Sequence, residues 1–270
     1  MNFAQLFNPV FKGIVCSILL MATSSSLNFR SLSVSAQAMA EAIREQLTFN
    51  PPDDDSLPDP GRSTSQQTPG SDRGDCPVVD LPLTALIPKP DQIRELTTQE
   101  YPTYWVYIPY GATQIHSIRF DLWQVGMNGA RQRLYTTNLS PNTIPGIVSF
   151  TPTASEAALT LSTATAMQEY EWIVTINCDD PQTPGGSNKR RVQGDIVRSS
   201  LPESMSNLSE SPSIEQAQIY AQNGFWYDTL TVLGNLRRQS DNEELKQLWT
   251  QLLSHEFVEL ESVTTEPIVD

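Results

Sequence analysis

The sequence feature that most constrains the fold is a series of short β-type segments between Cys76 and Ser200. The segments alternate apolar and polar residues or are rich in β-branched and aromatic ones. Turn-forming residues such as Asn128-Gly129 and Pro145-Gly146 separate them, and no helical period interrupts the series. Strands are therefore predicted at residues 83–88, 103–110, 114–124, 131–139, 146–150, 157–161, 169–177 and 191–197.

Many short strands without intervening helices are typical of an antiparallel β-sandwich. We therefore expect a sandwich domain with immunoglobulin-like architecture over residues 76–200. A true immunoglobulin domain places a Trp soon after its first Cys, whereas Cys76 precedes the first predicted strand. The sequence predicts the architecture and not membership of that family.

Beyond Leu201-Pro202 the apolar period lengthens, which predicts a C-terminal helical segment over residues 201–270 and a fold class of mainly β plus α. Ser211 is expected to cap a first helix that ends at Asn223-Gly224, and a second helix begins near Trp226. Asp241 and Glu244 resemble a capping box for a third helix. Its apolar residues have clear helical spacing: Leu245, Leu248, Trp249, Leu252 and Leu253.

Residues 221–230 and 240–244 resemble part of a tetratricopeptide repeat, with its turn glycine and the aromatic residue after it. Thr229 and Ser240 replace the usual Ala and Pro. Roughly three such units are needed for a stable array, and the segment holds about one and a half. We therefore expect the three helices to dock on the sandwich or on a partner.

Residues 1–38 have the pattern of a secretory signal peptide: Lys12 precedes a short apolar run, and small residues lead up to Ala38. The run is too short to span a bilayer. We expect cleavage near Ala38 and a periplasmic or secreted chain without a membrane span. An uncleaved anchor or an amphipathic targeting segment is the alternative. Residues 39–75 are dense in Pro, Asp and Ser, which predicts a disordered or extended tether.

Cys76 and Cys178 are the cysteines that remain once the leader is removed. An exported chain meets an oxidising compartment, where two thiols tend to pair, so a Cys76–Cys178 disulfide is predicted. Two buried free thiols are the alternative. A metal site is disfavoured because no Cys-x-x-Cys pair or His cluster accompanies either residue. We expect no metal and no cofactor.

The formal net charge is −14, and loss of Lys12 and Arg30 with the leader brings it to about −16. Such a charge repels nucleic acid and anionic membranes, and neither is an expected partner. The one basic cluster, residues 189–191, is interpreted as a solvated strand end.

Short motifs are spread over almost the whole chain beyond the leader: Phe49-Asn50-Pro51-Pro52, Arg73-Gly74-Asp75-Cys76, residues 83–88, residues 101–110, residues 145–149, Tyr170-Glu171-Trp172, Cys178-Asp179 and residues 224–228. Together they resemble a cyanobacterial family known as domain of unknown function 928. The resemblance implies a secreted or periplasmic protein. It supplies no activity.

Catalytic residues are not expected. His116 and His255 are interpreted as surface or cap residues rather than general bases. Glu169 and Glu171 share a strand face and could serve glycoside hydrolysis with a third group, but an exposed strand face explains them more simply. The nucleophile-elbow, zinc-protease and phosphate-loop motifs are missing from the sequence. We therefore expect a protein that is not an enzyme.

The aromatic residues of 101–110 are the sharper candidates. Trp105 and Tyr107 share one strand face, and the opposite face is apolar as well. Burial between layers accounts for both faces at once. The functional alternative is an exposed surface for sugars or a peptide, formed by Trp105 and Tyr107. The same choice applies to Trp226 and Tyr227.

These observations predict an exported interaction protein, without enzymatic activity, that binds another envelope or secreted protein. The alternative is a module of the cell envelope that binds polysaccharide.

Overall fold

Two mostly antiparallel β-sheets and three C-terminal helices make up the described part of the chain. The computed structural model describes residues 47–52, 65–70, 76–89, 93–126, 129–141, 143–163, 167–178, 188–206, 208, 212–240 and 242–269. The predicted signal peptide lies outside these ranges, as do residues 39–46, 53–64 and 71–75 of the predicted tether. Ser211 and Asp241, the expected helix caps, also lie outside them.

The smaller sheet has the strand order β1-β3-β6: β1 (Thr84–Ala85), β3 (Tyr104–Ile108) and β6 (Gly146–Phe150). The larger sheet has the order β2-β8-β7-β4-β5: β2 (Leu96–Thr97), β4 (Ser117–Val125), β5 (Arg131–Leu139), β7 (Glu169–Asn177) and β8 (Lys189–Arg198). Neighbouring strands are antiparallel except β2, which is parallel to β8.

The structure confirms every predicted strand but one. The stretch 157–161 is no strand, because the chain there turns: Ser155–Ala157 forms a 3-10 helix (η2), and the amide of Ala157 donates to Ala154 O. Conversely, β2 was not predicted, since two residues are too few to show a period.

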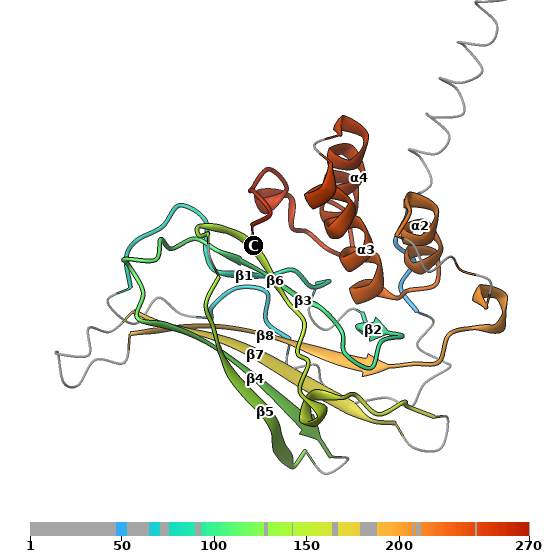
Figure 1. Ribbon diagram of the computed structural model, residues 1–270, viewed down its shortest axis with the longest axis horizontal. Coiled ribbons are helices and arrows are strands. Elements are labelled where there is room, and N and C mark those ends of the chain that lie inside the picture. Colours follow the sequence, from blue (N-terminus) through green and yellow to red (C-terminus); the bar gives the residue numbers. More distant parts are fainter. Residues whose placement is uncertain are drawn as a thin grey trace, which may run out of the picture. The chain divides into compact units, whose positions relative to one another are not determined.

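Aromatic side chains from the two sheets meet between them. The Tyr104 ring lies 4.8 Å from Phe120 on β4 and 5.4 Å from Trp172 on β7, measured between ring centroids. Phe120 also contacts Phe150 of β6 at 5.0 Å. Figure 1 shows β3 between the larger sheet and the helices. All five residues of β3 are buried, because side chains cover both of its faces.

The three helices are α2 (Ile214–Gln222), α3 (Trp226–Gln239) and α4 (Glu243–Leu253). Ser213 caps α2, and Asn242 caps α4, each accepting a hydrogen bond from a backbone amide of the first turn. The predicted caps were two residues and one residue too early, respectively. The chain turns between α2 and α3 at Gly224, whose φ of 76° favours glycine. All five predicted apolar residues of α4 are buried.

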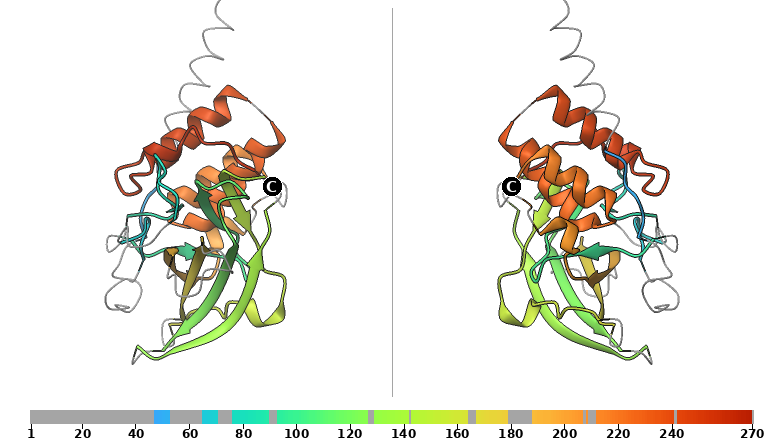
Figure 2. Two further views of the ribbon diagram at one scale, coloured as in Figure 1. Left: turned by 90° about the vertical axis from the view of Figure 1, so that its left-hand side faces the viewer. Right: turned by 90° about the vertical axis from the view of Figure 1, so that its right-hand side faces the viewer.

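The helices cover the face of the smaller sheet that points away from the larger one, and Figures 1 and 2 agree on this arrangement. Trp105 of β3 contacts Trp249 of α4 at 6.1 Å between ring centroids, and its indole N–H donates to Thr231 of α3. Helix and strand residues share one buried cluster. The predicted boundary near residue 200 therefore separates two kinds of secondary structure and not two separate cores.

Part of the predicted tether is folded. Leu47 and Phe49 are buried, and the Phe49 ring packs edge-on to Trp226 at 5.2 Å. Asn50 donates its amide to Ala221 O, and Gln66 forms a β-bridge with Gln193. The tether prediction is therefore wrong for residues 47–52 and 65–70. The prediction was based on the polar composition of residues 39–75 as a whole, which does not reveal a few buried apolar side chains and backbone hydrogen bonds within it.

The predicted disulfide between Cys76 and Cys178 is confirmed, with the two Cα atoms 5.3 Å apart. It joins the segment that leads into β1 to the end of β7 and closes a loop of 102 residues. Among the helices that the structure describes, none combines the length and the apolar character of a membrane span.

Candidate functional site

The four aromatic residues predicted as a candidate binding surface are buried: Trp105, Tyr107, Trp226 and Tyr227. Each is at most 5% exposed. The structure therefore supports their interpretation as core residues. The alternative prediction, an exposed aromatic surface for a ligand, is corrected. The physical reason is that the helices and the segment at Phe49 cover the faces that a lone sheet would expose.

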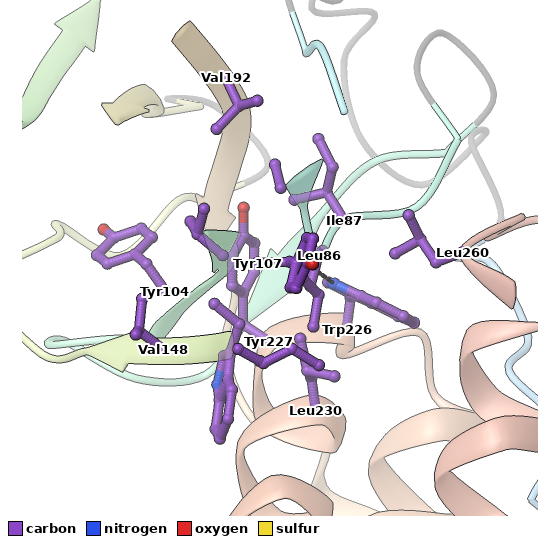
Figure 3. Packing of buried hydrophobic residues seen from close by; sticks show 14 of the residues in the cluster. Leu86, Ile87, Tyr104, Tyr107, Val148, Val192, Trp226, Tyr227, Leu230 and Leu260 are labelled. Atoms are coloured by element: carbon purple, nitrogen blue, oxygen red, sulfur yellow. Dashed lines mark hydrogen bonds between the residues drawn. The ribbon is translucent and has the colours of Figure 1, made fainter. Parts of the chain in front are cut away.

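Hydrogen bonds fix the buried indoles of Trp226 and Trp105 and explain why Trp is used at these two positions. The N–H of Trp226 donates to Leu86 O at 2.9 Å, which joins α3 to the residue after β1 (Figure 3). Trp105 is held by Thr231, and the Arg238 guanidinium lies 4.8 Å from its ring centroid. These contacts leave the rings no surface for stacking with a ligand.

A pocket of about 240 Å³ lies where α2 and α3 meet the segment 97–103 that joins β2 to β3. Its lining combines tyrosine rings, side-chain amides and hydroxyls, together with a single carboxylate. The lining residues are Thr97, Gln99, Tyr101, Pro102, Thr103, Pro212, Gln216, Tyr220, Tyr227, Asp228, Thr231, Val232 and Asn235. Gln99 is exposed, Tyr101 is half-buried, and Tyr220 is buried. This pocket is our candidate functional site.

Asp228 is the carboxylate of the pocket, and the first turn of α3 places it against the segment after β2. It accepts hydrogen bonds from the amide of Thr98 at 3.0 Å, from the Thr98 hydroxyl at 2.5 Å and from the Gln99 side-chain amide at 3.1 Å. Burial raises the pKa of Asp228, and these donors oppose the shift. Because three donors already occupy its oxygens, Asp228 holds the pocket wall in place.

Asp228 also affects its neighbour Tyr220 on α2. Burial raises the pKa of the Tyr220 phenol, and the charge of Asp228 raises it further. Tyr220 therefore stays a neutral hydroxyl at physiological pH. The pocket thus offers neutral donors and acceptors beside rings of tyrosine.

Behind the pocket, the Tyr227 hydroxyl belongs to a buried network. It accepts from Trp172 Nε1 at 2.6 Å and lies 2.7 Å from Glu95 Oε2 and 3.0 Å from Asp195 O. Ser65 donates to Glu95 Oε1 at 2.6 Å and accepts from the Asp195 amide at 2.8 Å. The network therefore ties α3 and the segment at Ser65 to the edge of β8.

Counting protons shows which form of Glu95 fits this network. The tyrosine hydroxyl has one proton, yet it faces two oxygen acceptors, Glu95 Oε2 and Asp195 O. A protonated Glu95 resolves this, because it donates to Tyr227 while Tyr227 donates to Asp195 O. Burial raises the pKa of Glu95 well above its usual value, and the charge of Asp195 adds to the effect.

The residues considered for catalysis lie apart from the pocket. His116 is exposed just before β4, and His255 follows α4, where burial lowers its pKa. Glu171 is fully buried and accepts from Arg131 at 2.7 Å, so it is not on an exposed strand face. Burial raises the pKa of Glu169 to about 7. Within the described ranges, no three His, Cys, Asp or Glu side chains are grouped to hold a metal ion.

The pocket was not predicted from the sequence, although two of its residues lie in the motifs described above. Tyr101 begins the aromatic motif of β3, and Asp228 ends the motif that starts at Gly224. An acidic residue directly after buried aromatics was the available signal. Gln99 and Tyr220 carried no signal, because nothing local indicates that they line the same pocket.

Comparison with known proteins places the chain in a family and supplies no further relative. Neither the curated proteins nor the solved structures contain a match. Residues 68–268 match the family described as Domain of Unknown Function (DUF928), a range that includes both sheets, all three helices and the pocket. The chain therefore belongs to the DUF928 family.

Proposed function

We propose that the chain is an exported binding protein without enzymatic activity, and that its pocket takes a neutral ligand rich in hydroxyl groups, such as a sugar unit of a polysaccharide. The observation that carries the proposal is the lining of the pocket. Amides, hydroxyls and tyrosine rings dominate it, and its one carboxylate is already engaged by Thr98 and Gln99.

The chemistry of such a lining suits a sugar. The Gln99 amide nitrogen already donates to Asp228 and Thr98, and the Asn235 oxygen accepts from Arg238, so the Gln99 oxygen and the Asn235 NH₂ group are the acceptor and the donor that match hydroxyl groups of the ligand. A tyrosine ring such as that of Tyr101 can cover the apolar face of a sugar ring. The volume of about 240 Å³ is below the roughly 300–1,000 Å³ of typical pockets for drug-sized ligands, so the occupant is small.

Apart from the hydrogen-bonded carboxylate of Asp228, the lining consists of uncharged groups, although the chain as a whole is strongly acidic, with a formal net charge of −14. A pocket for a cation would use this excess of carboxylates, and a pocket for an anion would need Lys or Arg in its lining. The lining contains neither a free carboxylate nor a basic residue. A neutral ligand is the remaining class.

Export and finer architecture belong to the same proposal. The Cys76–Cys178 disulfide supports an oxidising compartment, and the signal-like pattern of residues 1–38 supports periplasmic or extracellular localisation. The ring contacts between the sheets support a sandwich architecture. The α2–α3 turn at Gly224 supports a helical pair of tetratricopeptide type. The binding of another envelope or secreted protein, which is expected from the sequence, stays a prediction, and the pocket gives no support for it.

Affinity electrophoresis through gels that contain neutral glucan, mannan or galactan tests the proposal. We expect retardation by at least one polymer, and competition by its short oligosaccharides in solution. Tyr101→Ala and Asn235→Ala should each weaken binding by about tenfold, the effect of losing one good contact. Tyr101→Phe should retain most of the affinity, because the ring remains.

Asn138→Ala is the matched control for Asn235→Ala, since Asn138 is an exposed residue of β5 that is absent from the pocket lining. It should leave retardation unchanged. The proposal is wrong if no neutral polymer retards the protein, or if Tyr101→Ala and Asn235→Ala bind as well as the native chain while their melting temperatures stay the same.

A further inference from the structure

The outer edge of β5, the last strand of the larger sheet, is not paired with another strand. Apart from the Thr137 hydroxyl, which donates to Asn138 O at 3.5 Å, no described residue makes a hydrogen bond with a backbone group of β5 outside the ladder with β4. The 3-10 helix η2 lies beside β5 without bonding to its backbone. Such an edge can pair with another extended chain.

The outer sides of β8, β1 and β6 each have hydrogen bonds to a segment outside the strand ladders. On the side of β8 that points away from β7, Gln66 bonds to Gln193, and Glu95 O accepts from the Val197 amide. Gln67 O accepts from the amide of Ala85 on β1. On β6, the Ile147 carbonyl accepts from the Val269 amide near the end of the chain. Coverage of these edges makes the open edge of β5 the exception among the long strands that the structure describes.

The register shows which amides of β5 point outward. Cys178 donates to Asn188 O, so even-numbered residues of β7 bond to β8 and odd-numbered ones to β4. By the same alternation, even-numbered β4 residues bond to β5, which pairs Phe120 with Thr137. The N–H groups of Thr136 and Asn138 therefore point away from β4 toward the open edge.

The exposed charged side chains of β4 and β5 are arginines, whereas η2 beside β5 has one exposed carboxylate, Glu156. Arg131 and Arg133 are 40% and 51% exposed, and Arg119 on neighbouring β4 is 52% exposed. The carboxylates that they contact, Glu171 and Asp121, are at most 3% exposed. A partner therefore meets guanidinium groups and not their counter-charges, although the chain as a whole is acidic.

A register shift between β4 and β5 at Leu122/Trp123 leaves Leu134 as an extra residue. This bulge separates the two arginines of β5 from a regular stretch at residues 135–139. The edge thus has a ladder-forming part and, directly beside it, a cationic part. Figure 2 shows the β4–β5 hairpin curving away from the helices, so they do not cover it.

We propose that the outer edge of β5 binds an extended acidic peptide segment of a partner protein by strand addition. The peptide backbone pairs with residues 135–139 through the outward groups of Thr136 and Asn138. Its Asp and Glu side chains meet Arg131, Arg133 and Arg119. A second copy of the chain fits less well, because two cationic edges on two acidic molecules would repel each other. An anionic polysaccharide cannot use the ladder positions.

Amide hydrogen exchange measured by NMR tests the proposal, with a synthetic peptide of alternating Asp and Val as the probe. We expect the amides of Thr136 and Asn138 to exchange at least about tenfold more slowly when the peptide is present. A peptide of alternating Lys and Val should have no effect. Arg131→Gln with Arg133→Gln should weaken binding of the acidic peptide by about tenfold or more.

Asn138→Pro removes an outward N–H and leaves the bonds to β4 intact, so it should abolish peptide binding while the sheet persists. Asn138→Ala keeps the N–H and should bind within about twofold of the native chain. If Asn138→Pro does not fold, Arg133→Gln alone decides, because Asp121 keeps its bonds from Arg119 and Thr136 and a loss of amide protection tests the same pairing.

Three results would overturn the proposal. In the first, the acidic peptide binds without protecting Thr136 and Asn138. In the second, dextran sulfate binds Asn138→Pro as well as the native chain and the peptide does not bind, which would make the arginines a patch for polyanions. In the third, the two amides are protected without peptide in a concentration-dependent dimer, which would identify a second copy as the occupant.

Discussion

Gly234 of α3 lies directly against the indole ring of Trp105 on β3. A Cβ built on Gly234 would overlap three carbon atoms of the six-membered ring. On the same indole, Thr231 accepts the N–H of the five-membered ring, and the Arg238 guanidinium lies 4.8 Å from the ring centroid. Because residue 234 has no side chain, α3 can approach the sheet closely enough to make all three contacts.

Gly234→Ala should therefore destabilise the protein by about 1–3 kcal/mol, as expected for overpacking. The sign is informative, because Gly→Ala inside a helix normally stabilises it by up to about 1 kcal/mol. Chemical denaturation followed by tryptophan fluorescence measures the change.

Gly111→Ala is the control for Gly234→Ala, since its added methyl group would meet its nearest atom at 3.5 Å, an ordinary contact. It should change the free energy of unfolding by less than about 0.5 kcal/mol. A stabilised Gly234→Ala variant would show that α3 does not press against Trp105.

Removal of the disulfide should lower stability strongly. The bond between Cys76 and Cys178 closes a loop of 102 residues, for which the chain-entropy description gives up to about 4–5 kcal/mol. The double variant Cys76→Ser/Cys178→Ser should lose a comparable free energy of unfolding, measured with the native chain in the same denaturant series. Alkylation of both sulfurs in the native protein without reductant would contradict the bond.

The elements that could be predicted from the sequence are those whose signal is local. β7 shows its dense β-branched and aromatic residues within 169–177, and α4 shows its apolar spacing within 243–253. The disulfide followed from the cysteine count together with the leader. In each case neighbouring residues, or a simple count, contained the information.

The pocket could not be predicted, because its walls come from distant parts of the chain. Asp228 is 130 residues from Thr98, whose amide and hydroxyl it binds. Phe49 was assigned to a tether for a similar reason: its partner Trp226 is far away in the sequence, and the polar residues around Phe49 dominate the composition. Burial of Trp105 likewise depends on a glycine in α3.

Stability should fall as the pH rises above about 4.5, because Glu95 keeps its proton longer in the folded state than in the unfolded one. In the folded protein the pKa of Glu95 is raised above the usual 4.5, so on raising the pH Glu95 ionises first in the unfolded chain. Its ionisation lowers the free energy of the unfolded state relative to the folded one. Glu169, with a pKa of about 7, adds to the same trend between 4.5 and 7. One retained proton corresponds to a slope of about 1.4 kcal/mol per pH unit.

Glu95→Gln tests the origin of this slope, since glutamine cannot ionise. The variant should show a flatter dependence of the free energy of unfolding on pH above 4.5, measured by denaturation at several pH values. Glu169→Gln should flatten the slope only up to a pH near 7. An unchanged slope in Glu95→Gln would mean that the Tyr227 network holds an ionised carboxylate.

Asp228→Asn should loosen the pocket wall. The carboxylate accepts three hydrogen bonds from Thr98 and Gln99, and an asparagine side chain has one acceptor oxygen for them and brings an NH₂ group against the remaining donors. Leaving a buried donor unpaired costs about 1–3 kcal/mol, so thermal unfolding should move to lower temperature. Exchange of the Thr98 amide should also accelerate, which separates a local effect at the pocket from general destabilisation.

Glu100→Gln is the matched control for Asp228→Asn, since Glu100 is 49% exposed and lies 3.8 Å from Arg198. It should change the free energy of unfolding by less than about 0.5 kcal/mol. If Asp228→Asn leaves both the stability and the Thr98 amide unchanged, Asp228 does not hold residues 97–103 in place, and the lining that supports a neutral ligand has to be reconsidered.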